Sequence, residues 1–581
     1  MTGPDARGIP AFDRCFFESE RSFSRIGSGG LGGKATGLQL VREQILPQLG
    51  KDEFPLFAVE VPTLTVLATD SFDAFMRENR LSELPFSEMT DDRIAHAFQR
   101  AELPALLVGD LRALIARVHT PLAVRSSSLL EDSLEHPLAG VYATKMIPNN
   151  EIEVDARFRR LIEAVKLVYA STYFADARSF RASIGQSEAA ERMAVIIQEV
   201  VGQRSGDRYY PCISGVARSY NYYPSGSARP EEGVVYLALG LGKTIVDGGR
   251  SWGYCPTAPN APPPFNDIGE LLKNTQTGFW AVNMGPPPLP DPILETECMV
   301  ECSLGAAEAD GSLAWLVSTY EAGSDRLVPG LGRGPRALTF APLLGSRLVP
   351  FNDLIRRLLA LSEKSLGQAV EIEFAVTLDR RDGLPARLGF LQVRPMMVTA
   401  GKVDVDPAEL EGDDVLLASD IVLGNGARFD LTDVVYLKPE TFDPALTPRI
   451  ALELGTTNQE LMASGRSCLL IGFGRWGTSD PWLGVPVGWG QISSARVIVE
   501  ATLPGVNPDL SQGSHFFHNL LAFQVLFISV LHDGAFRVDW DWLASQPAIA
   551  ETNHVRHVRL ARPLEVRVDG RRRLGVVKRP K

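Results

Sequence analysis

Residues 121–132 read Pro121-Leu-Ala-Val-Arg-Ser-Ser-Ser-Leu-Leu-Glu-Asp132, an apolar run followed by a polar one. The apolar part predicts a short buried strand over 121–125 that leads into a polar loop. Arg125 stands at the end of this strand, beside three serine hydroxyls. A guanidinium in that position suits a polyphosphate, because its planar fork donates several hydrogen bonds to phosphate oxygens. A capped turn that binds nothing explains the same spacing equally well.

A glycine cluster lies upstream and runs Gly27-Ser-Gly-Gly-Leu-Gly-Gly33, followed by Lys34. It contains the spelling Gly-x-Gly-x-x-Gly, but the charged residues before it are not the buried strand that a dinucleotide fingerprint requires. Neither Lys34 nor the Gly-Lys-Thr at 242–244 completes a P-loop. Backbone N–H groups of such a loop, at the start of a helix, can still bind phosphate. A flexible turn before a surface lysine is the alternative.

Two downstream segments predict paired strands that carry acidic and amide side chains. They are residues 370–376, Val-Glu-Ile-Glu-Phe-Ala-Val, and 389–394, Gly-Phe-Leu-Gln-Val-Arg. Because alternate residues of a strand face the same side, Glu371 and Glu373 can point together. With a glutamine and an arginine on the neighbouring strand they suit a Mg²⁺-nucleotide site. A surface ladder of charges is the alternative, although the flanking residues are too apolar for a fully exposed hairpin.

Hydrophobic periodicity around these segments predicts a mixture of helices and strands. The helices are expected over 34–47, within 70–120, and over 156–183 and 351–366; further strands are expected within 54–67 and over 193–198. The proline-rich stretches 256–264 and 286–292 predict surface loops. No internal repeat of fixed period is present.

Taken together, these segments occur in the order that is typical of one family. They resemble the ATP-binding half of the pyruvate phosphate dikinase / phosphoenolpyruvate synthase family over residues ~27–397. Each segment is modestly specific, and the ordered set is strongly so. The matching segments are 32–38 (GGKATGL), 123–132 (AVRSSSLLED), 138–142 (LAGVY), 193–200 (MAVIIQEV), 214–219 (SGVARS), 240–242 (GLG), 371–374 (EIEF) and 391–395 (LQVRP).

The resemblance implies an α+β fold with an ATP-grasp nucleotide-binding half made of two α+β lobes. It also implies that ATP and Mg²⁺ are the cofactors. The residues that it assigns to ATP binding are Lys34, Arg125, Gln198, Glu199, Val200, Glu373, Gln392 and Arg394. Lys34 and Arg125 would bind phosphates, and Gln198 with its neighbours would lie at the adenine. Glu373 and Gln392 would hold the metal ion, and Arg394 would contact the transferring phosphates, so that Arg125 and Arg394 are also catalytic candidates.

Two positions depart from the family pattern within this region. Glu371 stands where the family has an aspartate, which is a mild change. Lys243 stands where the family has the glutamate of its Gly-Leu-Gly-Glu segment, and its role is left open.

The organisation of the chain predicts four segments. They are an N-terminal lobe with the glycine-rich loop (1–110), an ATP-grasp nucleotide-binding region (111–398), a polar linker (399–414) and a separate C-terminal α/β domain of unknown role (415–581). The phosphate-carrying histidine motif of the family is absent. A phosphoenolpyruvate-binding barrel needs about 250 residues, and only about 165 follow the linker. We therefore do not expect a complete phosphoenolpyruvate synthase.

The C-terminal segment holds two further candidates. His515 follows a turn of small residues and is a candidate phosphate carrier or general base, since imidazole is nucleophilic and titrates near neutral pH. A structural histidine beside Phe516 and Phe517 is the alternative. Arg475 lies in a glycine-rich stretch and is a candidate contact for the acceptor. Both stretches resemble an uncharacterised C-terminal extension, which implies no function.

Composition limits the class of partner. The 581 residues carry a formal net charge of −12, which argues against binding a nucleic-acid polymer. Six cysteines are too sparse for a disulfide framework, and the pair Cys298 and Cys302 lacks a second ligand pair at zinc-site spacing. With no signal peptide and no apolar run long enough to span a membrane, we expect a cytoplasmic protein.

The combined prediction is an ATP- and Mg²⁺-dependent phosphotransferase of dikinase type. It would pass a phosphate to a C-terminal histidine, His515, or directly to an unidentified acceptor, a small molecule or a protein. Transfer of the β-phosphate would give AMP, and transfer of the γ-phosphate would give ADP. The alternative is a non-enzymatic ATP-binding sensor or regulatory scaffold. The sequence does not indicate the oligomeric state.

Overall fold

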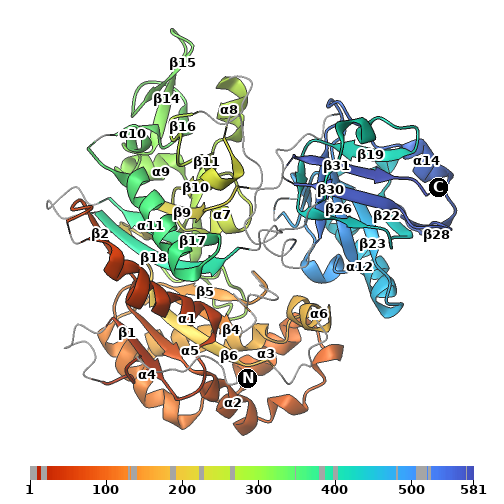
Figure 1. The fold of residues 1–581 in the computed structure, drawn as a ribbon. Helices are drawn as coiled ribbons and strands as arrows, with labels where there is room; N and C mark the ends of the chain where they lie inside the picture. The colour runs from red at the N-terminus through yellow and green to blue at the C-terminus, as the bar shows by residue number, and fades with distance from the viewer. Residues whose placement is uncertain are drawn as a thin grey trace.

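The computed structural model shows a mixed α+β protein (Figure 1). It describes residues 9–14, 22–50, 52–128, 131, 140–183, 191–221, 228–261, 268–346, 348–378, 386–396, 403–478, 480, 482–504, 520, 525–570 and 572–580.

The first lobe is built around a five-stranded sheet. Its strand order is β1 (Phe23–Ile26), β3 (Leu64–Leu67), β6 (Met193–Glu199), β4 (Leu122–Ser128) and β5 (Thr144–Ile147). Helices α2 (Thr69–Glu78), α3 (Asp91–Arg100), α4 (Ala105–Arg117) and α5 (Val154–Ser171) supply most of the apolar core beside it. Residue 110 lies within α4, and β3 pairs with β6, so strands from both sides of residue 110 share this sheet.

The second lobe contains a six-stranded sheet, drawn mostly in green in Figure 1. Its order is β11 (Trp252–Tyr254), β10 (Val234–Ala238), β9 (Ile213–Arg218), β17 (Val370–Thr377), β18 (Ala386–Pro395) and β2 (Phe57–Glu60). Helix α11 (Phe351–Leu366) packs on it. Two smaller sheets extend this lobe: β13-β12-β8-β7 (Met299–Ser303, Gly278–Asn283, Arg208–Tyr210, Gln203–Ser205) and β15-β14-β16 (Arg326–Pro329, Val317–Glu321, Arg336–Leu338).

Helix α1 (Gly32–Leu40) touches both lobes, because it contacts β4 in the first and β18 in the second. Gly32 has a φ of +76°, and a Cβ added there would lie 1.7 Å from the backbone oxygen of Ser127. Ser127 also fixes the start of the helix: its hydroxyl donates to the Leu31 oxygen at 2.8 Å and accepts from the Ala35 N–H at 3.1 Å. The glycine cluster therefore allows the first turn to press against the serines of β4.

The expected helices and strands were found, with local differences. The helix expected over 156–183 is two helices, α5 and α6 (Ala175–Ser183). The serines expected in a loop continue β4, where Ser126 pairs with Val195 and Ser128 with Met193.

The C-terminal unit, which we define as residues 403–580, has three sheets made only of its own strands among the described residues, the smallest being the pair β24 (Arg475–Trp476) and β25 (Gly484–Val485). The largest has the order β20 (Val422–Leu423), β27 (Leu526–Val530), β26 (Ala495–Ala501), β23 (Cys468–Phe473), β22 (Asp433–Leu437), β29 (Val555–Arg559) and β28 (Ala548–Glu551). Its middle strands, β27, β26, β23 and β22, run parallel. Helix α12 (Thr447–Ala463) connects β22 to β23. The four-stranded sheet has the order β19 (Val415–Ser419), β31 (Leu574–Lys578), β30 (Glu565–Asp569) and β21 (Asn425–Arg428) and is antiparallel. The expected polar linker already packs here, since Val405 is fully buried against Ala418 and Val576.

The C-terminal unit, drawn mainly in blue in Figure 1, lies beside the two lobes and is hydrogen-bonded to both. On the first lobe, the Gly490 N–H donates to the Asp176 carboxylate of α6 at 3.1 Å. Burial raises the pKa of Asp176 above its usual value, and this hydrogen bond opposes the rise. On the second lobe, the Arg475 guanidinium donates to the Gly248 oxygen at 2.9 Å. These two hydrogen bonds join the unit to both lobes.

We predict that Gly490→Ala detaches the C-terminal unit from the first lobe. The new Cβ would lie 2.9 Å from both the Asp176 carboxylate and the Ser179 hydroxyl, which is closer than real Cβ contacts. Small-angle X-ray scattering should show a larger radius of gyration than that of the wild type. Gly305→Ala is the matched control, because its Cβ would meet only the Ser303 hydroxyl, at 3.7 Å. A Gly490→Ala scattering curve identical to that of the wild type would contradict this interface.

Candidate functional site

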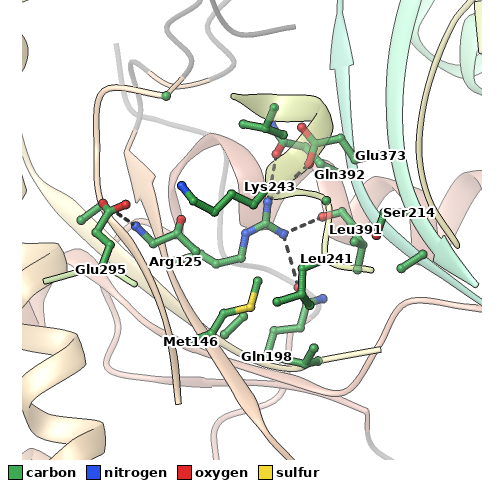
Figure 2. Close-up of a pocket in the computed structure, with 18 of the residues that line it drawn as sticks. Arg125, Met146, Gln198, Ser214, Leu241, Lys243, Glu295, Glu373, Leu391 and Gln392 are labelled. Atoms are coloured by element: carbon green, nitrogen blue, oxygen red, sulfur yellow. Dashed lines mark hydrogen bonds and ion pairs between the residues drawn. The ribbon is translucent and has the colours of Figure 1, made fainter. Parts of the chain in front are cut away.

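A cavity of about 290 Å³ lies between the two lobes. This volume is close to the lower end of the range typical of small-molecule sites. All eight residues expected to bind ATP line it, and they come from both lobes. They are Lys34, Arg125, Gln198, Glu199, Val200, Glu373, Gln392 and Arg394. Figure 2 labels Arg125, Gln198, Glu373 and Gln392 among them.

The Arg125 side chain connects the two lobes within this cavity. It leaves β4 of the first lobe and donates to the Leu391 oxygen at 3.1 Å and to the Gln392 Oε1 at 3.2 Å, both in β18. It also lies 3.7 Å from the Glu373 carboxylate and 3.4 Å from the Gln198 Oε1. Figure 2 shows these four interactions radiating from its guanidinium. The cation is therefore largely buried and already aimed at the groups expected to surround a nucleotide.

Lys34 enters the cavity from the first turn of α1. Its ammonium lies 2.6 Å from the Glu131 carboxylate and 3.3 Å from the Ser126 hydroxyl. The Ser126 hydroxyl in turn donates to Glu131 at 3.0 Å. The 121–132 segment thus supplies both the serines and the acid that hold the lysine, although sequence reasoning had given Glu131 no role.

Arg394 is held by a buried network that also explains Glu371. Glu371 pairs in register with Arg394 on one side and Arg218 on the other. Its carboxylate accepts from Arg394 and, at 2.6 Å, from Arg218. Burial alone would lower the pKa of Arg218, but the Glu371 carboxylate raises it above the usual value. Glu371 is absent from the cavity lining, so it positions Arg394 instead of sharing a face of the cavity with Glu373.

Glu373 and Gln392 are opposite each other in the β17–β18 register, next to an irregularity after Glu373. Their carboxylate and amide oxygens are the hard donors that Mg²⁺ prefers. The described residues contain no group of three or more His, Cys, Asp or Glu side chains that could form a metal cage. A Mg²⁺ ion held mainly by one carboxylate, substrate phosphates and water fits such a site.

The other end of the cavity is apolar. Val200 and Leu241 pack in one cluster with Met146 beside them, and the Val200 N–H donates to the Pro121 oxygen. Gln198 is 1% exposed, and in the described part of the chain its Nε2 is buried without a hydrogen-bond partner. An apolar slot with a buried amide donor at its wall suits a flat heterocycle that carries hydrogen-bond acceptors.

Sequence reasoning left three charged residues of the cavity without a role. Lys243 forms an ion pair with Asp247 at 2.5 Å. Glu295 accepts from the Thr144 N–H at 3.2 Å, and burial raises the pKa of its carboxyl group. The substitution of lysine for glutamate in the Gly-Leu-Gly segment was the sequence feature that pointed to Lys243. Nothing in the sequence around Glu295 marked it, because it comes from the loop between β12 and β13.

The structure places one of the two C-terminal candidate residues, Arg475. Arg475 is 7% exposed and contacts Gly248, one residue beyond the cavity-lining Asp247. It therefore adjoins the cavity wall without lining the cavity. His515 falls outside the described residues.

Cys298 is buried, which raises the pKa of its thiol to about 11, and it belongs to no metal-binding group among the residues described.

Residues 29–255 match the family model described as "Pyruvate phosphate dikinase, AMP/ATP-binding domain". The resemblance of this N-terminal part to the pyruvate phosphate dikinase / phosphoenolpyruvate synthase family is thereby confirmed. A relative is the phosphoenolpyruvate synthase of Aeropyrum pernix, which is 30% identical over 168 residues. The alignment covers 28% of this chain and 18% of the synthase, so the match spans less than a fifth of that relative.

Glu371→Gln is expected to lower the free energy of unfolding by about 3–5 kcal/mol, because it leaves two buried guanidinium groups without their shared carboxylate. Urea denaturation measures the change. Asp353→Asn removes an exposed ion pair with Arg356 and should change the stability by less than about 1 kcal/mol. Glu371→Asp keeps the charge and should fall between the two. Equal stabilities for Glu371→Gln and Asp353→Asn would contradict the structural role of Glu371.

A second buried carboxylate lies near Glu131. Glu191 is 5% exposed, and burial raises its pKa from 4.5 to about 7. Arg181 and a hydrogen bond to Ser128 oppose this rise, whereas the Glu131 charge adds to it. The folded chain therefore binds more protons at this site than the unfolded chain does between these two pH values.

We predict that this site lowers the stability of the fold as the pH rises. Between pH 4.5 and about 7 its contribution falls by about 3 kcal/mol and then levels off. The difference in unfolding free energy between the wild type and Glu191→Gln, followed across this range by urea denaturation, isolates the effect. A difference that does not vary with pH would contradict the raised pKa.

Proposed function

We propose that the chain is an ATP- and Mg²⁺-dependent phosphotransferase of dikinase type, with an ATP-grasp nucleotide site between its two lobes. The observation that carries the proposal is the composition of the cavity. Three cations, Lys34, Arg125 and Arg394, share it with the oxygen donors Glu373 and Gln392, and an apolar slot lies at its other end. That arrangement suits a molecule with a flat apolar end and a polyanionic end.

Each part of the cavity has a chemical role in this proposal. The base lies in the apolar slot, where it accepts a hydrogen bond from Gln198 and lies beside the backbone of Glu199 and Val200. Lys34 and Arg125 hold the phosphates in place, and Arg394 stabilises the charge that develops as a phosphoryl group leaves. Glu373 and Gln392 hold Mg²⁺, which when bound offsets phosphate charge.

The acceptor is proposed to lie on the side of the C-terminal unit. Arg475 reaches the loop that follows Asp247, so the unit adjoins the cavity wall. Phosphate passes to a C-terminal group, for which His515 is the candidate, or directly to an acceptor bound between the unit and the lobes. Transfer of the β-phosphate gives AMP, with the γ-phosphate passing to water as inorganic phosphate, and direct γ-transfer gives ADP. The described residues form no helix that could cross a membrane.

We expect purified protein with ATP and Mg²⁺ to release AMP, and Glu373→Gln to lower the rate by roughly 100-fold, since a metal-holding carboxylate is lost. Chromatographic separation of AMP, ADP and phosphate measures both. Glu411→Gln, an exposed carboxylate of the C-terminal unit, is the control and should keep the wild-type rate. His515→Ala tests the carrier: it abolishes AMP release if phosphate passes through this histidine.

Other products would change the proposal in defined ways. ADP release that His515→Ala does not affect excludes the histidine carrier and leaves a direct kinase. ATP binding without turnover, even with a panel of small-molecule and protein acceptors, favours the sensor or scaffold. A Glu373→Gln variant with the wild-type rate contradicts the assignment of the site.

A further inference from the structure

Lys243 adds a cation to the cavity at a position where the resembled family carries an acid. It begins the short helix α7 (Lys243–Val246) in the second lobe, and its side chain lines the cavity. Figure 2 shows the side chain running across the cavity from this helix, above the Arg125 side chain and toward Glu295. Lys243 therefore shares the cavity with the cations already assigned to phosphate.

The four cavity cations are held by their acidic partners to different degrees. Lys34 is paired with Glu131, which is 1% exposed, and Arg394 with Glu371, which is 2% exposed. Arg125 is fixed by four groups of the cavity wall. Lys243 is 28% exposed and forms its ion pair with Asp247, which is four residues along the chain and 35% exposed, while the Glu295 carboxylate also attracts it.

Partly exposed pairs of this local kind are weak. Pairs that are buried on both sides are much harder to break. Of the four cavity cations, Lys243 therefore loses the least interaction free energy when it leaves its carboxylate partner to bind a ligand anion. A lysine ammonium is a compact point charge that binds phosphate oxygens well. The phosphates are the only anionic part of a nucleotide, so any electrostatic gain at Lys243 depends on how many phosphates the ligand carries.

We propose that Lys243 is a phosphate-contact residue that leaves Asp247 when a nucleotide binds, and that it makes the site favour nucleoside triphosphates over monophosphates. Asp247 competes with the ligand for the ammonium group and holds it at the cavity wall in the empty site. The proposal rests on the nucleotide-binding function proposed above and adds a determinant of phosphate number. It involves no covalent step.

Isothermal titration of the full chain with ATP, ADP and AMP in the presence of Mg²⁺ tests it. Lys243→Met should weaken ATP binding by about tenfold, as expected for a lost hydrogen bond to a charged group, and AMP binding by less than about twofold. Asp247→Asn should tighten ATP binding by about twofold, because it removes the competing charge. Lys364→Met is the control and should bind ATP like the wild type, because this exposed lysine on α11 donates a hydrogen bond to Gln48 and does not line the cavity.

The outcomes separate this inference from the function on which it rests. If the wild type binds no ATP, the proposed function itself fails. If the wild type binds ATP but Lys243→Met binds all three nucleotides with wild-type affinity, only the role of Lys243 fails. Equal weakening of ATP, ADP and AMP also overturns it, because a phosphate contact must discriminate by phosphate number. If Lys243→Met does not fold, Asp247→Asn still decides, since weaker or unchanged ATP binding in that variant contradicts the exchange.

Discussion

The arrangement of the cavity depends on Arg125, a cation of the first lobe whose hydrogen-bond partners lie mainly in the second. A largely buried guanidinium requires acceptors, and the Leu391 oxygen, Gln392 and Glu373 provide them from β17 and β18. These contacts bring the two sheets together around one cavity. They also preassemble positive charge beside oxygen donors, so that little reorganisation is required when a polyanion enters. Lys34 and Arg394 extend the positive surface from helix α1 and strand β18.

Sequence reasoning anticipated which residues would meet, because the relevant positions lie at strand ends or in short polar segments. It could not predict which side chains would form ion pairs or hydrogen bonds with these residues. The Arg218–Glu371–Arg394 network depends on the register of three strands, and that register is set by sheet packing over a long chain separation. For the same reason the serines after Arg125 looked like a loop, whereas pairing with β6 keeps them in the strand.

Helix ends and the linker were the least predictable features. No glycine or proline marks the break between α5 and α6, which falls at residues 172–174. The acidic composition after residue 399 suggested a free linker, but Val405 and Leu410 bury themselves against Ala418 and Val576. A few apolar residues thus decide the path of a segment whose average composition is polar. The C-terminal unit has its own sheets, yet Asp176 and Arg475 tie it to the nucleotide lobes, so its position is coupled to theirs.

A crystal structure of the full chain with a non-hydrolysable ATP analogue and Mg²⁺ tests the central claim most directly. The account predicts the base in the apolar slot with a hydrogen bond from Gln198, and the phosphates among Lys34, Arg125 and Arg394. The metal ion should lie beside Glu373 and Gln392. A nucleotide bound outside this cavity, or placed in it with its phosphates at the apolar end, would contradict the account.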